Sequence, residues 1–333
     1  MKKILTLILF ATMMLTTNGA FAQNNLVATL NHEGAISYFY GSNALVNAHE
    51  AATHGDVITL SVGTFNPTTI TKAVTIYGSG MEFTIYEGQV TAISGDFSIN
   101  ITDEVDTPLL IQGIYSRSSI TVTQVPDNSQ LLKSRLSYVD VRDEITFIHC
   151  KITYSFSSES GQKNLYNCFM SQDGPMNNVQ AYNCVVIYSH NSGYSNPYYA
   201  NGTSNSSFYN CIICQKEDQS NRVFPSSNTI YNSVGIGNNY LFSSIIGIKN
   251  SYSNYESIFK EYSGTYSDTV SFELTDEAKT AYLGYDGTQI GVYGNSTPYD
   301  PRPTVPLITT YQVAPTAING KVSVNIVING GAE

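Results

Sequence analysis

The chain of 333 residues has no tryptophan, and only 13% of its residues are charged. Its 16 lysines and arginines are outnumbered by 26 aspartates and glutamates, which gives a net charge of −10. This balance excludes a basic patch that binds nucleic acid or an anionic membrane surface, and an acidic polymer would need bridging calcium. The lack of tryptophan removes the commonest platform for sugar rings and leaves tyrosine as its substitute.

Motifs for catalysis and metal binding are also missing. The sequence contains no Gly-x-Ser-x-Gly, no phosphate loop and no Asp-Asp pair. No histidine forms a cluster with cysteine at metal-ligand spacing. The histidines are His32, His49, His54, His149 and His190. We therefore predict neither a metal site nor a cofactor, and we assign no catalytic residue.

One set of acidic and basic residues is close together in the sequence: Asp140, Arg142, Asp143 and Glu144. In a strand, Asp140 and Arg142 share one face and Asp143 points away. The set would bind calcium and supply the base of a polysaccharide lyase only if other segments contributed ligands. The simpler interpretation is a solvated charged edge, so calcium is expected only if the protein is a lyase.

The N-terminus predicts export. Lys2 and Lys3 precede the apolar run 4–15, and Ala20-Phe21-Ala22 supplies a small-x-small cleavage site. The run is too short for a membrane span, and no later segment approaches one. We predict a signal peptide at residues 1–22 and an extracytoplasmic mature chain in the periplasm, at the cell surface or in the medium. Loss of the two lysines would change the net charge to −12.

An irregular repeat predicts the fold. Five segments of six residues align without gaps, at 147–152, 165–170, 181–186, 208–213 and 230–235. Their aligned Cys or Ser residues are 18, 16, 27 and 22 residues apart, and a weaker segment at 248–251 follows after 18 more. Such uneven steps exclude a helical repeat, whereas short stacked strands keep register while the loops between them vary. We predict an all-β, right-handed parallel β-helix in which equivalent residues stack in columns.

Three columns follow from this alignment. The first is an asparagine ladder at a bend, in which each amide bonds to backbone or to neighbouring amides: Asn167, Asn183, Asn210 and Asn232, with His149 and Asn250 as extensions. The second faces the core: Cys150, Cys168, Cys184 and Cys211. These cysteines are either buried thiols, which we favour, or include a disulfide, and Cys214 lies outside the column. The third faces outwards: Tyr166, Tyr182, Tyr209 and Tyr231.

The x-Asn-Cys-x-Ile pattern resembles the repeats of right-handed parallel β-helix proteins of the pectate-lyase-like superfamily. The segments 54–60, Gly63-Thr64-Phe65 and 70–80 resemble the first coils of such proteins. Before them, a helix at 43–53 would place Ala44, Leu45, Ala48, Ala51 and Ala52 on one face, and the resemblance implies that this helix plugs the end of the coil. Residues 286–294 resemble the closing segment of secreted β-helices of Bacteroidetes type.

These observations imply a β-helix domain at 23–295 and a proline-rich linker with terminal strands at 296–333. The strand at 322–328 is expected to pair with 308–313 or to cover the far end of the coil.

The tyrosines suggest a function. The outward row could hold sugar rings, or it could only stabilise the sheet. A polar loop after Cys184 carries Tyr194, Tyr198 and Tyr199, and it is either a wall beside this row or an ordinary surface excursion. We predict a non-catalytic protein that binds a polysaccharide or surface glycan along its long face. The alternatives are a divergent polysaccharide lyase or glycoside hydrolase, and a structural surface spacer. The oligomeric state is left open.

Overall fold

In the computed structural model of the chain, the described residues are 26–81, 90–158, 160–172, 176–188, 203–215, 227–236, 248–252, 254–263, 270–302, 307–313, 321 and 324–329. The predicted signal peptide at residues 1–22 lies outside them. Within these ranges, no helix combines the length and apolarity that a membrane crossing requires.

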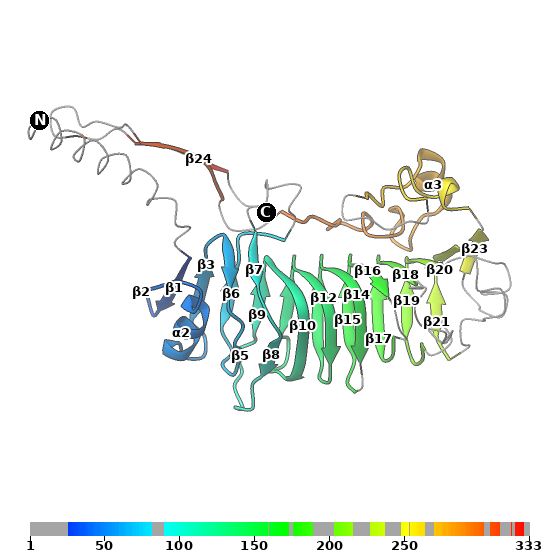
Figure 1. The fold of residues 1–333 in the computed structure, drawn as a ribbon. Coiled ribbons are helices and arrows are strands. Elements are labelled where there is room, and N and C mark those ends of the chain that lie inside the picture. The colour runs from blue at the N-terminus through cyan, green and yellow to red at the C-terminus, as the bar shows by residue number, and fades with distance from the viewer. Residues whose placement is uncertain are drawn as a thin grey trace, which may run out of the picture.

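Two long sheets form a parallel β-solenoid of right-handed type with about seven turns (Figure 1). This arrangement confirms the fold class predicted from the repeat. Sheet A contains eleven strands in the spatial order β2 (Ala35–Tyr40), β1 (Val27–His32), β3 (Val57–Leu60), β6 (Thr75–Tyr77), β9 (Leu110–Gln112), β11 (Gln130–Leu132), β13 (Ile145–Ile148), β15 (Lys163–Tyr166), β17 (Val179–Tyr182), β19 (Ser207–Tyr209) and β21 (Thr229–Tyr231).

Sheet B contains twelve strands. Two of them, β5 (Thr69–Ile70) and β8 (Phe97–Asn100), pair with each other, and β8 also pairs with β10. The other ten follow one path: β4 (Gly63–Phe65), β7 (Thr91–Ile93), β10 (Ile114–Gln124), β12 (Arg135–Val141), β14 (Lys151–Ser158), β16 (Phe169–Gln172), β18 (Val185–Tyr188), β20 (Ile212–Gln215), β22 (Ser233–Ile236) and β23 (Ile248–Tyr252).

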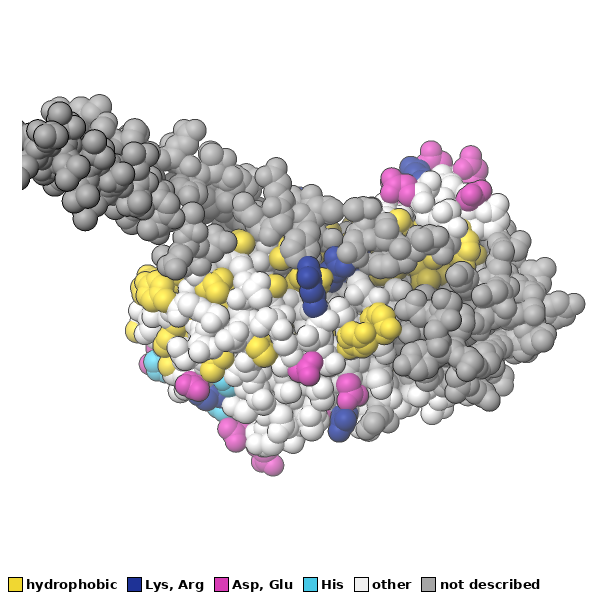
Figure 2. All heavy atoms as spheres, viewed as in Figure 1, with side chains coloured by type: hydrophobic (Ala, Val, Ile, Leu, Met, Phe, Trp, Pro, Cys, Tyr) yellow, Lys and Arg dark blue, Asp and Glu magenta, His cyan; other side chains and the backbone are white. Residues whose placement is uncertain are grey.

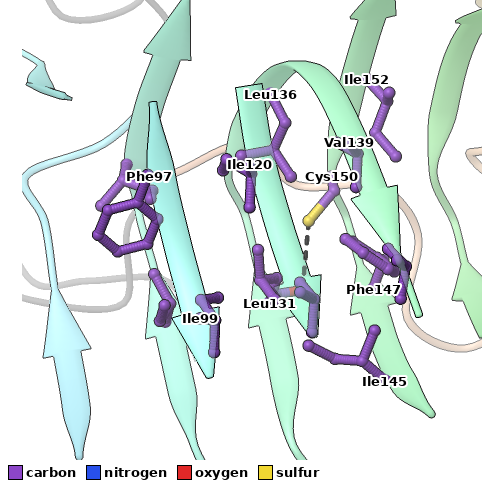
Figure 3. Close-up of a cluster of buried hydrophobic side chains, with 14 of the residues drawn as sticks. Phe97, Ile99, Ile120, Leu131, Leu136, Val139, Ile145, Phe147, Cys150 and Ile152 are labelled. Atoms are coloured by element: carbon purple, nitrogen blue, oxygen red, sulfur yellow. Dashed lines mark hydrogen bonds between the residues drawn. The ribbon is translucent and has the colours of Figure 1, made fainter. Parts of the chain in front are cut away.

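Alternation along the short strands builds the core between the sheets. In β15 and β17, Leu165 and Ala181 are fully buried, and the tyrosine that follows each of them lies on the opposite face. Figure 3 shows how branched and aromatic side chains from successive turns fill the interior, where Cys150 Sγ donates to the carbonyl oxygen of Leu131 at 3.2 Å. The solenoid therefore has one continuous apolar interior.

Four cysteines form a fully buried column in this interior. The N–H groups of Cys150, Cys168 and Cys184 each point to the sulfur one turn later, at 3.4 Å, and the N–H of Cys211 donates to Ser233 Oγ at 3.0 Å. All five cysteines lie in the described part and are free thiols. Burial raises the pKa of the Cys168 and Cys211 thiols, so both remain neutral packing groups.

The corner between the two sheets explains the asparagine column. The residue after each of six sheet A strands has a positive φ between 43° and 53°: Lys133, His149, Asn167, Asn183, Asn210 and Asn232. Asparagine adopts this left-handed conformation more readily than most residues with a side chain. Asparagine therefore recurs here because of the backbone conformation. Asn250 does not belong to this column, because β23 lies in sheet B and pairs Asn250 with Val234.

Residues 284–302, here called the C-terminal strap, run back along this corner. The amide oxygen of Asn210 accepts from Tyr285 N at 3.1 Å. Asn167 Nδ2 donates to the carbonyl oxygens of Val292 and Gly294, at 2.9 and 3.0 Å, and Asn167 Oδ1 accepts from Asn295 Nδ2 at 2.7 Å. At Asn167 and Asn210, the amides thus bond to backbone groups, one of the two kinds of partner predicted for this column, and these groups belong to the strap.

The strap continues past the next two corner residues. His149 Nε2 lies 3.0 Å from the carbonyl oxygen of Thr297, and Lys133 Nζ donates to the carbonyl oxygen of Arg302 at 3.0 Å. A side chain on Gly294 would collide with Asn183 Nδ2, so glycine permits the close approach of the strap. The segment 286–294, which resembles a closing segment, therefore lies along the side of the rod.

A second apolar core covers the outer face of sheet B along β16, β18, β20 and β22. Phe169, Val185 and Ile212 point outwards from this sheet and are buried by residues that follow β23. Phe169 stacks on Phe272, with ring centroids 4.4 Å apart. The covering segment includes the 3-10 helix η2 (Tyr255–Ser257) and the helix α3 (Asp276–Ala281).

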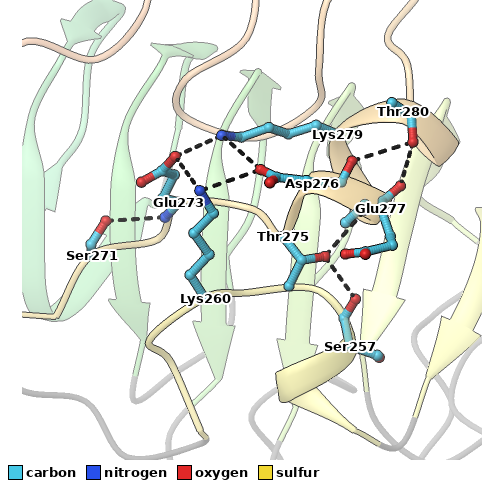
Figure 4. A network of polar contacts seen from close by, with 10 residues as sticks. Ser257, Lys260, Ser271, Glu273, Thr275, Asp276, Glu277, Lys279 and Thr280 are labelled. Atoms are coloured by element: carbon cyan, nitrogen blue, oxygen red, sulfur yellow. Dashed lines mark hydrogen bonds and ion pairs between the residues drawn. The ribbon is translucent and has the colours of Figure 1, made fainter.

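Ion pairs stabilise this covering segment near α3 (Figure 4). Lys260 Nζ and Lys279 Nζ both contact Glu273 Oε1, at 3.0 and 2.6 Å, and Lys260 Nζ lies 3.4 Å from Asp276 Oδ1. Thr275 begins α3 by accepting a hydrogen bond from Ala278 N at its side chain. Figure 2 shows that charged side chains gather at this corner of the molecule, whereas they are scattered over the central strands.

The other end of the solenoid is closed by more than the predicted helix. The helix α2 (Ala44–Ala51) buries Ala44, Leu45 and Ala48 in the main core, but Ala51 is exposed, contrary to the predicted face. β1 and β2 form an antiparallel hairpin that extends sheet A beyond β3, and the sequence did not predict it.

Near the C-terminus, β24 (Leu307–Val313) pairs with β25 (Val324–Asn329), which confirms the predicted pairing of the terminal strands.

Candidate binding face

The outer face of sheet A presents two parallel rows of side chains, because residues two apart in a strand point to the same side. The first, called the tyrosine row, lies in register on four neighbouring strands: Tyr166, Tyr182, Tyr209 and Tyr231. The second, called the polar row, comes two residues earlier on the same strands: Asn164, Gln180, Ser207 and Thr229. Neither row contains a charged side chain.

The tyrosine rings form an unbroken stack. Their centroids are 5.1 Å apart between Tyr166 and Tyr182, 4.8 Å between Tyr182 and Tyr209, and 5.3 Å between Tyr209 and Tyr231. The ring planes differ by 7–10°. Each ring therefore covers the flat face of its neighbour, and the row offers edges and hydroxyl groups rather than flat faces. The last ring, Tyr231, is 54% exposed.

A hydrogen bond joins the two rows, since Tyr182 Oη donates to Gln180 Oε1 at 3.1 Å. The pKa of Tyr182 is raised, first by burial and then by repulsion from the phenolate forms of Tyr166 and Tyr209. The Tyr182 hydroxyl group is therefore protonated at neutral pH, when the face can interact through uncharged donors and acceptors only.

The acidic and basic residues singled out in the sequence are not among the eight positions of these two rows. Asp140 belongs to β12 in sheet B and forms an ion pair with Arg142 at 3.0 Å. Asp143 accepts hydrogen bonds from Val125 N and from Glu144 N, both at 2.9 Å. In the part of the chain that the structure describes, no group of three or more His, Cys, Asp or Glu residues could hold a metal ion. Tyr194, Tyr198 and Tyr199 lie outside the described residues.

Sequence reasoning missed a pocket of about 410 Å³ on sheet B, at the β4 end of the rod. Its lining includes Thr64, Ser94, Tyr115 and Arg117. Arg117 Nε donates to Tyr115 Oη at 2.9 Å, and the Arg135 guanidinium lies 5.0 Å from the centroid of the same ring. The pairing of β4 with β7 and of β7 with β10 brings the lining residues together, and the register of β10 and β12 adds Arg135 beside them, so no local motif predicts the pocket.

Comparison of the chain with protein-family models, curated proteins and solved structures finds no match. The pectate-lyase-like superfamily and the Bacteroidetes-type origin therefore stay predictions that rest on the sequence motifs. The parallel β-solenoid itself follows from the strand register.

Proposed function

We propose that this protein binds a glycan, without cleaving it, along the outer face of sheet A. The observation that supports the proposal is the unbroken tyrosine row beside an uncharged polar row on a partly exposed sheet face. Aromatic groups and uncharged hydrogen-bonding groups are the combination that recognises sugars, whose surfaces alternate C–H patches with hydroxyl groups.

The geometry refines how a sugar would bind. Because the inner rings cover one another, a sugar would contact ring edges and tyrosine hydroxyl groups. The amides of Asn164 and Gln180 would supply further donors and acceptors to the sugar hydroxyls. Tyr231 lies at the exposed end of the stack, on β21, which is the last described strand of sheet A. At the other end of the stack, Tyr166 has Ile148 of β13 beside it instead of a further tyrosine.

The two rows favour binding over catalysis. Lyases and hydrolases need a carboxylate, imidazole, amine or guanidinium group at the reacting sugar. The eight side chains of the two rows include none of these groups. The spacer alternative needs no ligand, and it attributes the tyrosine row to sheet stability alone.

A pair of double variants tests the proposal. The first carries Tyr182→Ala and Tyr209→Ala. The matched control carries Tyr138→Ala and Tyr154→Ala, which also removes two partly exposed tyrosines in contact, with centroids 4.4 Å apart, but on sheet B. Retention on a polysaccharide panel and release of reducing ends or unsaturated products are both measured.

We expect the wild-type protein to be retained by at least one polysaccharide without releasing product. The Tyr182 and Tyr209 variant should lose at least about tenfold in affinity, while the control keeps it. Product release would replace the proposal with an enzyme. Equal retention of both variants, or no retention of the wild type by any polymer, would also overturn it.

A further inference from the structure

The uncharged surface of sheet A extends far beyond the tyrosine row. Strand register continues this row through every remaining strand of the sheet to β2. From β13 to β2 its positions are Ile148, Leu132, Gln112, Tyr77, Thr59, Thr29 and Tyr38.

The polar row extends in the same way. From β13 to β2 its positions are Thr146, Gln130, Leu110, Thr75, Val57, Asn31 and Ile36. Two rows on eleven strands give 22 positions, and none of them is Asp, Glu, Lys, Arg or His. At the average of 13% charged residues for this chain, about three would be charged. The face is therefore depleted of charge relative to the rest of the protein.

The far end of this face repeats the chemistry of the tyrosine row. Ile36, Tyr38 and Tyr40 alternate along β2, so they share the outer face, and they are 57–65% exposed. Val27 and Thr29, their neighbours on β1, are partly exposed on the same side. Apolar and aromatic groups thus occur at both ends of the face, with Tyr77 and with threonine, glutamine and aliphatic residues between them.

The dimensions of the face indicate the shape of its ligand. Eleven strands at about 4.8 Å per step give a length of roughly 50 Å. Both rows lie on the outside of a sheet, and all their positions except the buried Gln112 are at least partly exposed, so a ligand would rest on an open surface rather than enter a cleft. A long, open, uncharged surface matches an extended polymer better than a short oligosaccharide, which binds best in an enclosing pocket.

We propose that the whole outer face of sheet A, from β2 to β21, is one docking surface for an extended, uncharged polysaccharide that lies along the axis of the rod. This inference rests on the proposed glycan binding and specifies its ligand class. Charge supports the choice, because the protein carries a net charge of −10 and the face has no cation to attract an acidic polymer. Adhesion depends on many weak contacts distributed over the length of the rod.

The test uses the full chain and three double variants. Tyr38→Ser with Tyr40→Ser alters the β2 end, Tyr182→Ala with Tyr209→Ala alters the tyrosine row, and Tyr138→Ser with Tyr154→Ser is the control on sheet B. Both β2 side chains are largely exposed, so these substitutions leave the core intact. The probes are particulate cellulose, chitin and starch as neutral polymers, their trisaccharides, and polygalacturonate as an acidic polymer.

We expect one or more neutral polymers to retain the protein equally at low and high salt, and to bind it at least tenfold more tightly than the matching trisaccharide. The β2 variant should weaken retention by at least about fivefold, and the control should not. If the β2 variant binds like the wild type while the tyrosine-row variant does not, the extended surface is wrong and the proposed function stands. If no variant changes retention, both are wrong.

Two further results would overturn the extended surface. One is preferential, salt-sensitive binding of polygalacturonate. The other is a dimer, seen by sedimentation, that the β2 variant abolishes without any loss of retention, because the edge of β2 would then serve contact between copies of the chain.

Discussion

The two outer faces of the solenoid differ in what covers them. On sheet B, Phe169, Val185 and Ile212 point outwards and are buried beneath the segment that follows β23. On sheet A, the outward positions of the same turns are tyrosine, asparagine, glutamine and serine, and they remain partly exposed. A strand stack presents two outer faces with equal backbone geometry, so the outward side chains decide which face receives a covering layer.

The largest effect is expected on the covered face. Phe272→Ala removes a buried ring that stacks on Phe169 and should lower the free energy of unfolding by about 3–5 kcal/mol. Chemical denaturation provides the measurement. Tyr285→Ala is the control, because Tyr285 is 92% exposed, and it should change little. A loss below about 1 kcal/mol for Phe272→Ala would show that the covering layer does not stabilise sheet B.

The corner that joins the two faces should show the next largest effect. Asn167→Ala loses the amide bonds to the strap and places alanine at φ 48°, so it should destabilise by about 2–5 kcal/mol. Asn167→Gly loses the same bonds, but glycine adopts this left-handed conformation without strain. Its loss in the free energy of unfolding should therefore be about 1 kcal/mol smaller than that of Asn167→Ala. Equal losses in the two variants would contradict a role for the left-handed backbone.

Acidification should weaken the packing of the strap on the corner through His149. Its Nε2–H donates to Thr297 O, and its Nδ1 is buried without a hydrogen-bond partner among the described residues. Burial lowers the pKa of His149, and the charge of Lys133 lowers it further, against the opposing effect of the bond to Thr297. A second buried histidine, His49, has a pKa lowered to about 4 by burial and by Lys72.

A histidine with a lowered folded-state pKa binds fewer protons when folded than when unfolded. Its contribution to stability is therefore complete above the ordinary pKa of 6.5 and declines as the pH falls toward 4. Unfolding measured across this window should show His149→Asn, the residue found at neighbouring corners, with a shallower decline than the wild type. A decline of equal slope in the variant would rule out His149 as a contributor.

The stability of the protein should depend less on the tyrosines of the outer face of sheet A than on the aromatic residues that cover sheet B. Tyr182→Ala removes two ring contacts, each worth about 0.2–1 kcal/mol, so the free energy of unfolding should fall by no more than about 2 kcal/mol. A small loss of stability together with a large loss of polysaccharide retention would show that Tyr182 serves binding more than it serves the stability of the fold. A loss as large as that of Phe272→Ala would favour the spacer alternative.

The cysteines should be inert to thiol reagents, since four lie in the interior between the sheets and Cys214 lies in the apolar core on the outer face of sheet B. All five cysteines are fully buried, so none should react in the folded protein and all five should react after unfolding. Time-resolved labelling provides the test. Rapid labelling of Cys168 in the folded state would place the cysteine column at the surface.

The repeating part of the chain was predictable, and the parts that pack on it were not. The gapless segments around Cys150, Cys168, Cys184 and Cys211 fix the register of β13–β22, because stacked strands tolerate no slip of one residue. The same alignment predicted the direction of the tyrosines. It misplaced Asn250, because residues 248–252 form β23 in sheet B, where Asn250 pairs with Val234 and not with a corner residue.

The covering layer and the strap left no periodic signal. Phe259, Tyr262 and Phe272 come from irregular chain, and Phe272 stacks on Phe169 of sheet B, which lies 103 residues earlier in the sequence. The asparagines were recognised as a column, but their amide partners belong to a segment whose path only the folded structure defines. The extended uncharged face likewise requires the register of all eleven strands of sheet A.

Hydroxyl-radical footprinting of the wild-type protein, with and without a retained neutral polysaccharide, shows which face of the solenoid the polymer covers. We expect the polymer to protect Tyr38, Tyr40 and the four residues of the tyrosine row, and to leave Tyr138 and Tyr154 on sheet B unprotected. Protection of the sheet B pair, with the tyrosine row labelled as in the free protein, would contradict this expectation.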